Sequence, residues 1–122
     1  MTSGVDAKGR LKNYRRGHRA EVLAAAYMMT KGYRILARRL KTAAGEIDLI
    51  AVRGRRLAFV EVKRRATLAH CQASITPRLR QRVRRASSLW LAGRPRFHEY
   101  DQGFDVIFMR AWRWPVHLPD AL

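Results

Sequence analysis

Residues 45–64, GEIDLIAVRGRRLAFVEVKR, decide the fold because they hold two strand patterns separated by a glycine. The segments 45–53 and 56–64 are rich in β-branched and aromatic residues, which favour a pleated, half-buried strand. Gly54 and Arg55 form a two-residue connection, and glycine in its first position suits a type II′ turn. The stretch therefore predicts an antiparallel β-hairpin.

Three acidic residues lie inside these strands, although strand interiors disfavour carboxylates that have no specific role. They are Glu46, Asp48 and Glu61. Alternate side chains of a strand share a face, so Glu46 lies beside Asp48, and Glu61 lies beside Lys63. The register that a two-residue turn imposes sets Asp48 opposite Glu61, and it sets Glu46 opposite Lys63.

Carboxylates that face each other across a ladder repel unless a cation lies between them or one of them is protonated. Mg²⁺ or Mn²⁺ suits this position, because hard cations take carboxylates, a backbone carbonyl such as that of Val62, and water. Lys63 projects beside Glu61, where its ammonium group can orient an attacking water or stabilise phosphate charge. Asp48, Glu61 and Lys63 are therefore the candidate catalytic residues for metal-assisted phosphodiester hydrolysis.

The same spacing also fits an ordinary hairpin with a cross-strand Glu46–Lys63 ion pair, in which Asp48 marks a strand end. The catalytic interpretation depends on the register, because a slip of one residue moves every side chain to the other face of the sheet. Spacing alone leaves both interpretations open.

The charge balance indicates a polyanionic partner. The 122 residues include 26 Lys and Arg against 9 Asp and Glu, a formal net charge of +17. Such an excess opposes compaction through self-repulsion, whereas nucleic acid compensates it and releases counterions. Most of the basic residues are arginine, which binds phosphate bidentately and stacks on exposed nucleobases. A solvated basic surface without a partner, or an anionic membrane surface, is the alternative.

Length and cysteine content narrow the class further. One domain with a modest core is expected at this length. The single cysteine, Cys71, excludes an internal disulfide and a thiolate zinc site. No secretory hydrophobic segment follows the start, and no apolar run approaches the roughly 18 residues of a membrane span. We expect a cytoplasmic protein with no membrane partner.

Helix and strand patterns flank the hairpin. Residues 18–31 are rich in Ala, Leu, Met and Glu and predict a helix, with Gly32 placed to end it. Residues 33–40 predict a strand. Residues 66–75 predict a loop.

A second helix is expected to begin at Thr76 and Pro77, a cap residue followed by a first-turn proline, and to end near Leu91. Its buried stripe is expected to be Leu79, Val83, Ala86 and Trp90. Residues 104–112 predict a further strand. This order predicts an α/β domain with a central mixed sheet flanked by helices.

Residues 17–114 are expected to form this domain. A flexible basic arm at residues 1–16 precedes it, and an irregular tail at residues 115–122 follows it. The candidate nucleic-acid contacts lie on the second helix and the arm. They are Arg78, Arg80, Arg82, Arg84, Arg85, Arg15 and Arg16. The aromatic side chains of Trp90, Trp112 and Trp114 could stack on bases, but packing in the core or at an interface is favoured.

The hairpin sequence GEIDLIAVRGRRLAFVEVKRR, preceded by GHRAEVLAAAYMMTKGYRILARR, resembles the YraN family of small bacterial proteins. The resemblance covers roughly residues 17–112. That family resembles the PD-(D/E)XK nuclease superfamily, with a restriction-endonuclease-like fold similar to that of archaeal Holliday-junction resolvases. GEID followed by FVEVK at this spacing is a much more specific pattern than E-x-K alone.

The resemblance implies a metal-dependent nuclease. Asp48 matches the superfamily aspartate, and Glu61-Val62-Lys63 matches its E-x-K motif. Glu21 is implied as a third acid brought to the metal by the first helix, although an acid in a first turn is also favoured by the helix dipole. Asp105 matches a recurrent aspartate on the later strand, for which a structural role is favoured.

One position departs from the family pattern. Relatives tend to carry a lysine just after the proline of the second helix, where this chain has Leu79 between Arg78 and Arg80. Either a neighbouring arginine takes over the phosphate contact, or activity is lost.

The expected function is that of an endonuclease dependent on Mg²⁺ or Mn²⁺, hydrolysing DNA, in particular branched or otherwise structured DNA. DNA is favoured over RNA as the partner. Junction resolution would require two active sites and hence a homodimer. The alternative is a nucleic-acid-binding module that keeps the nuclease fold without its chemistry.

Overall fold

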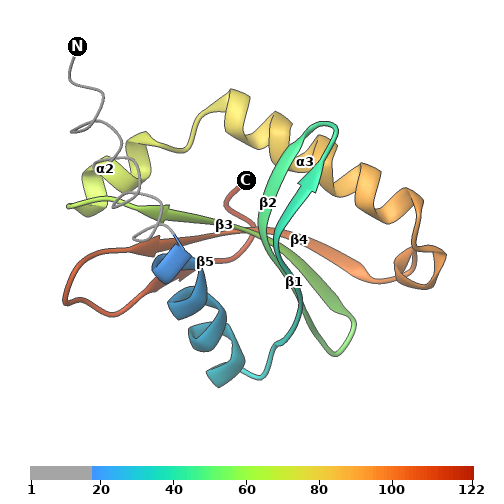
Figure 1. Ribbon diagram of the computed structural model, residues 1–122, viewed down its shortest axis with the longest axis horizontal. Coiled ribbons are helices and arrows are strands. Elements are labelled where there is room, and N and C mark those ends of the chain that lie inside the picture. Colours follow the sequence, from blue (N-terminus) through green and yellow to red (C-terminus); the bar gives the residue numbers. More distant parts are fainter. Residues whose placement is uncertain (1–17) are drawn as a thin grey trace, which may run out of the picture.

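A computed structural model of the protein describes residues 18–122, which form a five-stranded sheet with helices on both faces (Figure 1). The strands are β1 (Arg34–Thr42), β2 (Gly45–Arg53), β3 (Arg56–Arg64), β4 (Asp101–Met109) and β5 (Val116–Leu118). They lie in the order of the chain, with β3 and β4 parallel and all other neighbours antiparallel. The predicted mixed sheet with flanking helices is confirmed, and it is consistent with a restriction-endonuclease-like fold. The predicted arm, with Arg15 and Arg16, lies outside the described residues.

The predicted hairpin has the predicted register. β2 and β3 occupy the predicted segments, and Ile50 pairs with Phe59 and Arg53 with Arg56 around the turn. Gly54 has a φ of 58°, as the first position of a type II′ turn requires.

Helices cover both faces of the sheet. Residues 18–30 form the N-terminal helix on one face, and α3 (Pro77–Ala92) crosses the other (Figure 1). Between β3 and β4 the chain also forms α2 (Leu68–Ala73) and the short 3₁₀ helix η1 (Pro95–Phe97). This long connection is what allows two strands to run parallel.

The core has one apolar layer on each face. The predicted stripe of α3, which is Leu79, Val83, Ala86 and Trp90, is buried against the sheet together with Phe59. On the opposite face a second cluster forms between the N-terminal helix and the strand residues whose side chains point to that face. It includes Ala24, Met28, Leu49, Ala58, Val60 and Ile107. The strand hairpin is therefore apolar on both faces, which makes carboxylates at its end conspicuous.

Two segments that were expected to be irregular contain regular structure. Residues 66–75 include α2, which begins because the hydroxyl of Thr67 accepts a hydrogen bond from the backbone N–H of His70. Residues 115–122 include β5, which pairs with β4, and Leu122 packs in the core. Both segments are too short for a recognisable period.

The later strand is displaced from its predicted range of 104–112. β4 begins at Asp101, which pairs with Arg56, and ends at Met109, which pairs with Arg64. Its length is therefore set by its parallel partner β3 rather than by its own hydrophobic pattern.

A buried ionic network ties β3, β4 and the C-terminal residues together. Asp105 is fully buried and accepts two hydrogen bonds from Arg56, at 2.7 and 2.8 Å, and one from His117 at 2.8 Å. Burial alone would raise the pKa of Asp105, but the hydrogen bonds from Arg56, His117 and the backbone of Asp120 hold it well below its usual range. The guanidinium crosses Gly103, where a Cβ would lie 2.2 Å from it.

Removal of the Asp105 carboxylate should destabilise the fold. In Asp105→Ala the half-buried Arg56 loses its bidentate partner, so the free energy of unfolding in urea should fall by roughly 3–5 kcal/mol at neutral pH. The matched variant Asp101→Ala removes an exposed acid from the same strand and should change it by less than about 0.5 kcal/mol.

The stabilisation that Asp105 provides should depend on pH. Since the pKa of Asp105 lies below its unfolded value, its stabilisation is present above the unfolded value and is lost as the pH falls through the folded one. The difference in the free energy of unfolding between wild type and Asp105→Ala should therefore become smaller at acid pH. Equal destabilisation by the Asp101 and Asp105 variants would contradict a structural role for Asp105.

Candidate active site

A pocket of about 530 Å³ lies where β2 and β3 part. The ladder between them ends at the Leu49–Val60 pair, one residue short of Asp48 and Glu61. The predicted register therefore holds up to this point, but the two carboxylates are not a ladder pair. Residues from four elements line the pocket. They include Glu21 of the N-terminal helix, Glu46 and Asp48 of β2, Glu61, Val62 and Lys63 of β3, and Arg82 of α3.

Asp48 bridges the two strands with its side chain. Its Oδ2 accepts a hydrogen bond of 2.8 Å from the backbone N–H of Val62. Burial is the main cause that raises the pKa of Asp48 to about 8, and the charge of Glu61 adds to it. Glu21 and Glu46 raise it further, while the hydrogen bond from Val62 opposes the shift. Additional positive charge would favour the ionised form of this carboxyl group.

Three carboxylates of the pocket lie close together. Ligand oxygens of Glu21, Glu46 and Asp48 lie within 4.8 Å of one another. Nε of Arg39 lies 3.4 Å from Glu21 and 3.7 Å from Glu46. Burial raises the pKa of Glu21, with Arg39 acting against the shift. The alternative Glu46–Lys63 pair was wrong, because Glu46 contacts Arg39 and Lys63 contacts Glu61.

Glu61 also lines the pocket and is almost fully buried, at 4% exposure. One of its oxygens, Oε1, lies 3.4 Å from Nζ of Lys63 and accepts a hydrogen bond of 3.0 Å from Arg82. Its second oxygen, Oε2, is buried and accepts no hydrogen bond from residues 18–122. One oxygen of this carboxylate is thus compensated, and the other has no hydrogen-bond partner within the described part of the chain.

This donor set fits a hard divalent cation. Oε2 of Glu61 is buried without a hydrogen bond from the described part of the chain, and burial of such an atom is costly. Oε2 of Glu21 also lacks a hydrogen bond from residues 18–122, although Nε of Arg39 lies 3.4 Å from it. Mg²⁺ and Mn²⁺ prefer oxygen ligands, and Mg²⁺ typically takes one or two carboxylates together with several waters. Asp48, Glu61 and Glu21, with Glu46 as a further carboxylate and the Val62 carbonyl, are the residues that would hold such an ion.

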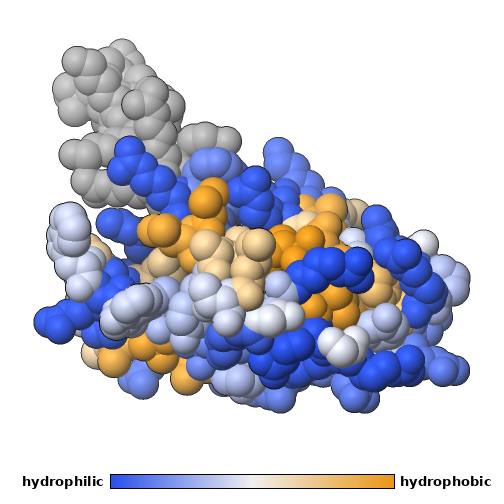
Figure 2. Space-filling model, turned by 90° about the horizontal axis from the view of Figure 1, so that it is seen from below, coloured by the Kyte–Doolittle hydropathy of each residue, from blue (hydrophilic) through white to orange (hydrophobic). Residues whose placement is uncertain are grey.

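The arginines of α3 form a basic surface beside the pocket. All five predicted side chains are exposed, but only some of them are available. Arg82 is bound to Glu61, and Arg84 donates a hydrogen bond to the Leu122 carbonyl and lies over the ring of Phe104. The remaining three are Arg78, Arg80 and Arg85. Their side chains make no hydrogen bond or ion pair with any residue from 18 to 122. Figure 2 views the molecule from below, on the side away from α3 in Figure 1, and shows hydrophilic side chains with hydrophobic patches between them.

The position that departs from the family pattern faces the core. Leu79 lies on the buried side of α3, with 5% exposure, while Arg78 and Arg80 on either side are exposed. Of the tryptophans, Trp90 packs in the core as expected, whereas Trp112 and Trp114 are exposed.

Two contributors to the pocket were predicted to have another role. Glu46 was predicted to share a strand face with Asp48 and to pair with Lys63, but it clusters with Glu21 and Asp48 instead. Arg82 was predicted as a phosphate contact, yet its guanidinium is bound to Glu61. No local pattern distinguishes Arg82 from the neighbouring arginines, because the contact depends on how α3 packs over the hairpin.

Comparison with known proteins places the chain among relatives of similar length. The family model described as "Uncharacterised protein family UPF0102" matches residues 20–109. The chain belongs to the UPF0102 family. It is 47% identical to a UPF0102 protein of Rhizobium meliloti (strain 1021) over 112 residues, which cover 92% of each chain. A UPF0102 protein of Mesorhizobium japonicum is 48% identical, with 92% of this chain and 90% of that protein covered. The resemblance to the YraN family is thereby confirmed.

The matched UPF0102 segment contains every carboxylate of the pocket, from Glu21 to Glu61, together with Lys63 and Arg82. It ends before Trp112 and Trp114. Within residues 18–122 no helix combines the length and apolar character needed to cross a membrane.

Neutralising Asp48 should stabilise the metal-free protein. Because the pKa of Asp48 is higher in the folded state, stability is lost as the pH rises from the unfolded value through about 8. The amide of the variant Asp48→Asn would keep an oxygen to accept the Val62 hydrogen bond but would not titrate. In urea unfolding at pH 8 with EDTA, this variant should gain roughly 1 kcal/mol over wild type, and the gain should vanish near pH 4.

The matched control is Asp101→Asn, which alters an exposed acid outside the pocket. It should show no pH-dependent gain. A loss of stability in Asp48→Asn at pH 8 would indicate that the charge of Asp48 is already compensated, and it would contradict the electrostatic description of the pocket.

Proposed function

We propose that this UPF0102 protein is a metal-dependent endonuclease that hydrolyses phosphodiester bonds in DNA, in particular in branched or structured DNA. The observation that carries the proposal is the buried Oε2 of Glu61, which lacks a hydrogen-bond partner among residues 18–122 and lies in the same pocket as three clustered carboxylates. A protein with a net charge of +17 has abundant cations with which to neutralise acids. Several acids that lie together in one pocket of so basic a protein favour a cationic ligand that these carboxylates bind.

The residues of the pocket divide the chemical work. Bound Mg²⁺ or Mn²⁺ would supply Lewis-acid stabilisation of the phosphate and lower the pKa of the attacking water. Asp48 and Glu61, with Glu21 and Glu46, supply the negative charge that binds the ion. The ammonium group of Lys63 is held 3.4 Å from Glu61, which fixes it at the pocket, where it can orient the water or stabilise charge on the phosphate.

Substrate binding is attributed to the basic surface. Arg78, Arg80 and Arg85 are exposed on the helix that also sends Arg82 into the pocket. Arginine contacts to phosphate position a duplex without reading its sequence, so cutting directed by DNA shape rather than by base identity is expected.

A second candidate is a nucleic-acid-binding module that lacks the chemistry. It is favoured by the ion pairs already present in the pocket, since Arg82 and Lys63 compensate Oε1 of Glu61, and Arg39 contacts Glu21 and Glu46. In that case the arginine surface would act alone and the acids would hold α3, β1 and the N-terminal helix to β2 and β3.

Incubation with plasmid, single-stranded and four-way-junction DNA separates these functions. With Mg²⁺ or Mn²⁺ the wild type should cut at least one substrate, and EDTA should stop it. Asp48→Asn and Lys63→Met should each reduce the rate by at least about 100-fold, because each removes a group from the reacting centre. Asp101→Asn should cut like the wild type.

Binding to the same substrates in EDTA supplies the control for the two pocket variants, which should retain affinity. Undiminished cutting by both variants would rule out this site. No cutting by wild type, together with affinity whose logarithm falls linearly with the logarithm of salt concentration, would establish the binding module instead.

A further inference from the structure

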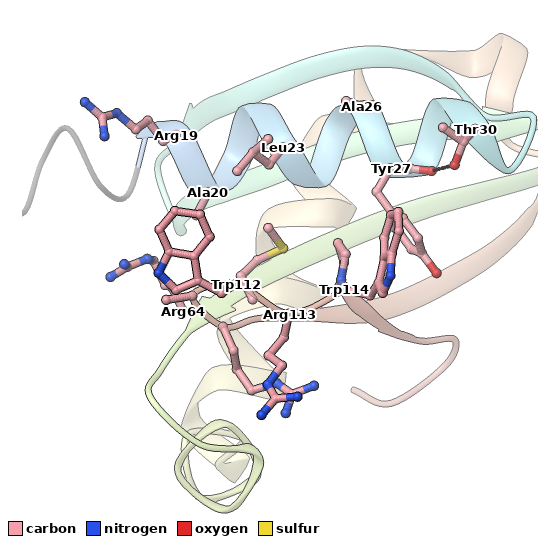
Figure 3. A pocket seen from close by; sticks show the side chains of 14 residues that line it. Arg19, Ala20, Leu23, Ala26, Tyr27, Thr30, Arg64, Trp112, Arg113 and Trp114 are labelled. Carbon is pink, nitrogen blue, oxygen red and sulfur yellow. Dashed lines mark hydrogen bonds between the residues drawn. The ribbon is translucent and has the colours of Figure 1, made fainter.

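A second, larger hollow of about 730 Å³ runs beneath the N-terminal helix (Figure 3). Leu23 and Tyr27 of the helix line one side of it, and Trp112 and Trp114, in the segment after β4, line the other. Figure 3 shows Trp112 at the Ala20 end and Trp114 at the Tyr27 end. We refer to this hollow as the tryptophan groove.

The aromatic side chains of the groove are unusually accessible. Trp112 is 101% exposed and Trp114 is 84% exposed, and Leu23 on the helix is 58% exposed. Tryptophan is among the residues that gain most from burial, so two exposed indoles in one hollow indicate a surface that a ligand covers. Trp112 also has a φ of 60°, a conformation that is costly for a bulky residue and that clusters at ligand sites.

The charge of the groove selects the ligand. Arg19, Arg64, Arg110 and Arg113 line it, and no acidic residue of the described chain does. Flat aromatic surfaces interspersed with guanidinium groups are what proteins use to hold single-stranded nucleic acid, because bases stack on the rings while the cations bind the phosphates.

The groove adjoins the carboxylate pocket. Ala20 and Arg64 line both hollows, and they are the chain neighbours of Glu21 and Lys63. A strand lying in the groove would therefore pass Arg64 and present its next phosphodiester to the acids. Figure 3 places Arg64 at the same end of the groove as Arg19 and Trp112.

We propose that the tryptophan groove binds an unpaired segment of nucleic acid, with bases stacked on Trp112 and Trp114, immediately beside the carboxylate pocket. The inference rests on the proposed function for its orientation, and it names the substrate class as DNA with a single-stranded stretch next to the bond that is cut. A fully paired duplex would leave the indoles without bases to stack on.

The test measures binding of oligothymidylate and of a blunt duplex in EDTA, by fluorescence anisotropy at fixed salt. Trp112→Ala and Trp114→Ala should each weaken binding of oligothymidylate by about fivefold or more, whereas the blunt duplex should be affected less than twofold. Trp112→Phe and Trp114→Phe should restore most of the affinity, because a phenyl ring still stacks. Leu89→Ala, which removes an exposed apolar side chain from α3, should have no effect.

Folding does not confound this comparison, because both indoles are exposed, and the buried Trp90 reports an intact core by its fluorescence. Equal affinity of wild type and the double alanine variant for oligothymidylate would overturn the proposal. So would a loss of self-association in the double variant, which would assign the groove to a second copy of the chain. A loss of binding to phosphatidylserine vesicles, with binding to oligothymidylate unchanged, would assign it to a membrane surface and likewise overturn it.

These outcomes are independent of catalysis, since no metal is present. Stacking-dependent binding by a wild type that cuts nothing would retain the groove and reject the nuclease. Metal-dependent cutting by a double variant of unchanged affinity would do the reverse.

Discussion

The structure depends on a hydrogen bond at the point where the central hairpin opens. Beyond the Leu49–Val60 pair, β2 no longer pairs with β3, and the Asp48 carboxylate takes the Val62 N–H in place of a backbone carbonyl. A buried N–H must have an acceptor, so the carboxylate is held there even though burial and its acidic neighbours oppose its charge. The opening thus keeps a strand pair connected and concentrates negative charge in one pocket. The N-terminal helix, β1 and α3 contribute to that pocket by how they pack on the hairpin.

Two buried aspartates show how differently the fold treats the same side chain. Asp105 receives hydrogen bonds from Arg56 and His117, and its pKa lies below the usual range. Asp48 is surrounded by other acids, and its pKa is raised. The first arrangement stabilises the sheet without further ligands. The second is left undercompensated, which is the pattern expected where a site is arranged to bind a cation.

The sequence predicted the parts of this structure that local rules determine. Period-two alternation and a glycine turn were enough to place β2 and β3 and to set Ile50 against Phe59. They could not show that the ladder ends before Asp48, because beyond Leu49–Val60 β2 stays paired with β1 while β3 stays paired with β4. The same limit explains why the contact of Arg82 was not predicted, since Arg82 is one arginine among several on its helix. It also explains why β5 was not predicted, since these three residues are extended because they pair with β4. Glu46 was identified as anomalous but given the wrong partner, since its pairing with Lys63 extended the ladder three pairs beyond Leu49–Val60.

We propose that the acids of the pocket bind one divalent cation. The most direct measurement is anomalous diffraction from a crystal of the protein soaked in Mn²⁺. We expect an anomalous peak between Asp48 and Glu61, with oxygen ligands from both and from at least one of Glu21, Glu46 and the Val62 carbonyl. A peak elsewhere, or no peak in a pocket whose acids keep their ion pairs with Arg39 and Arg82, would contradict it.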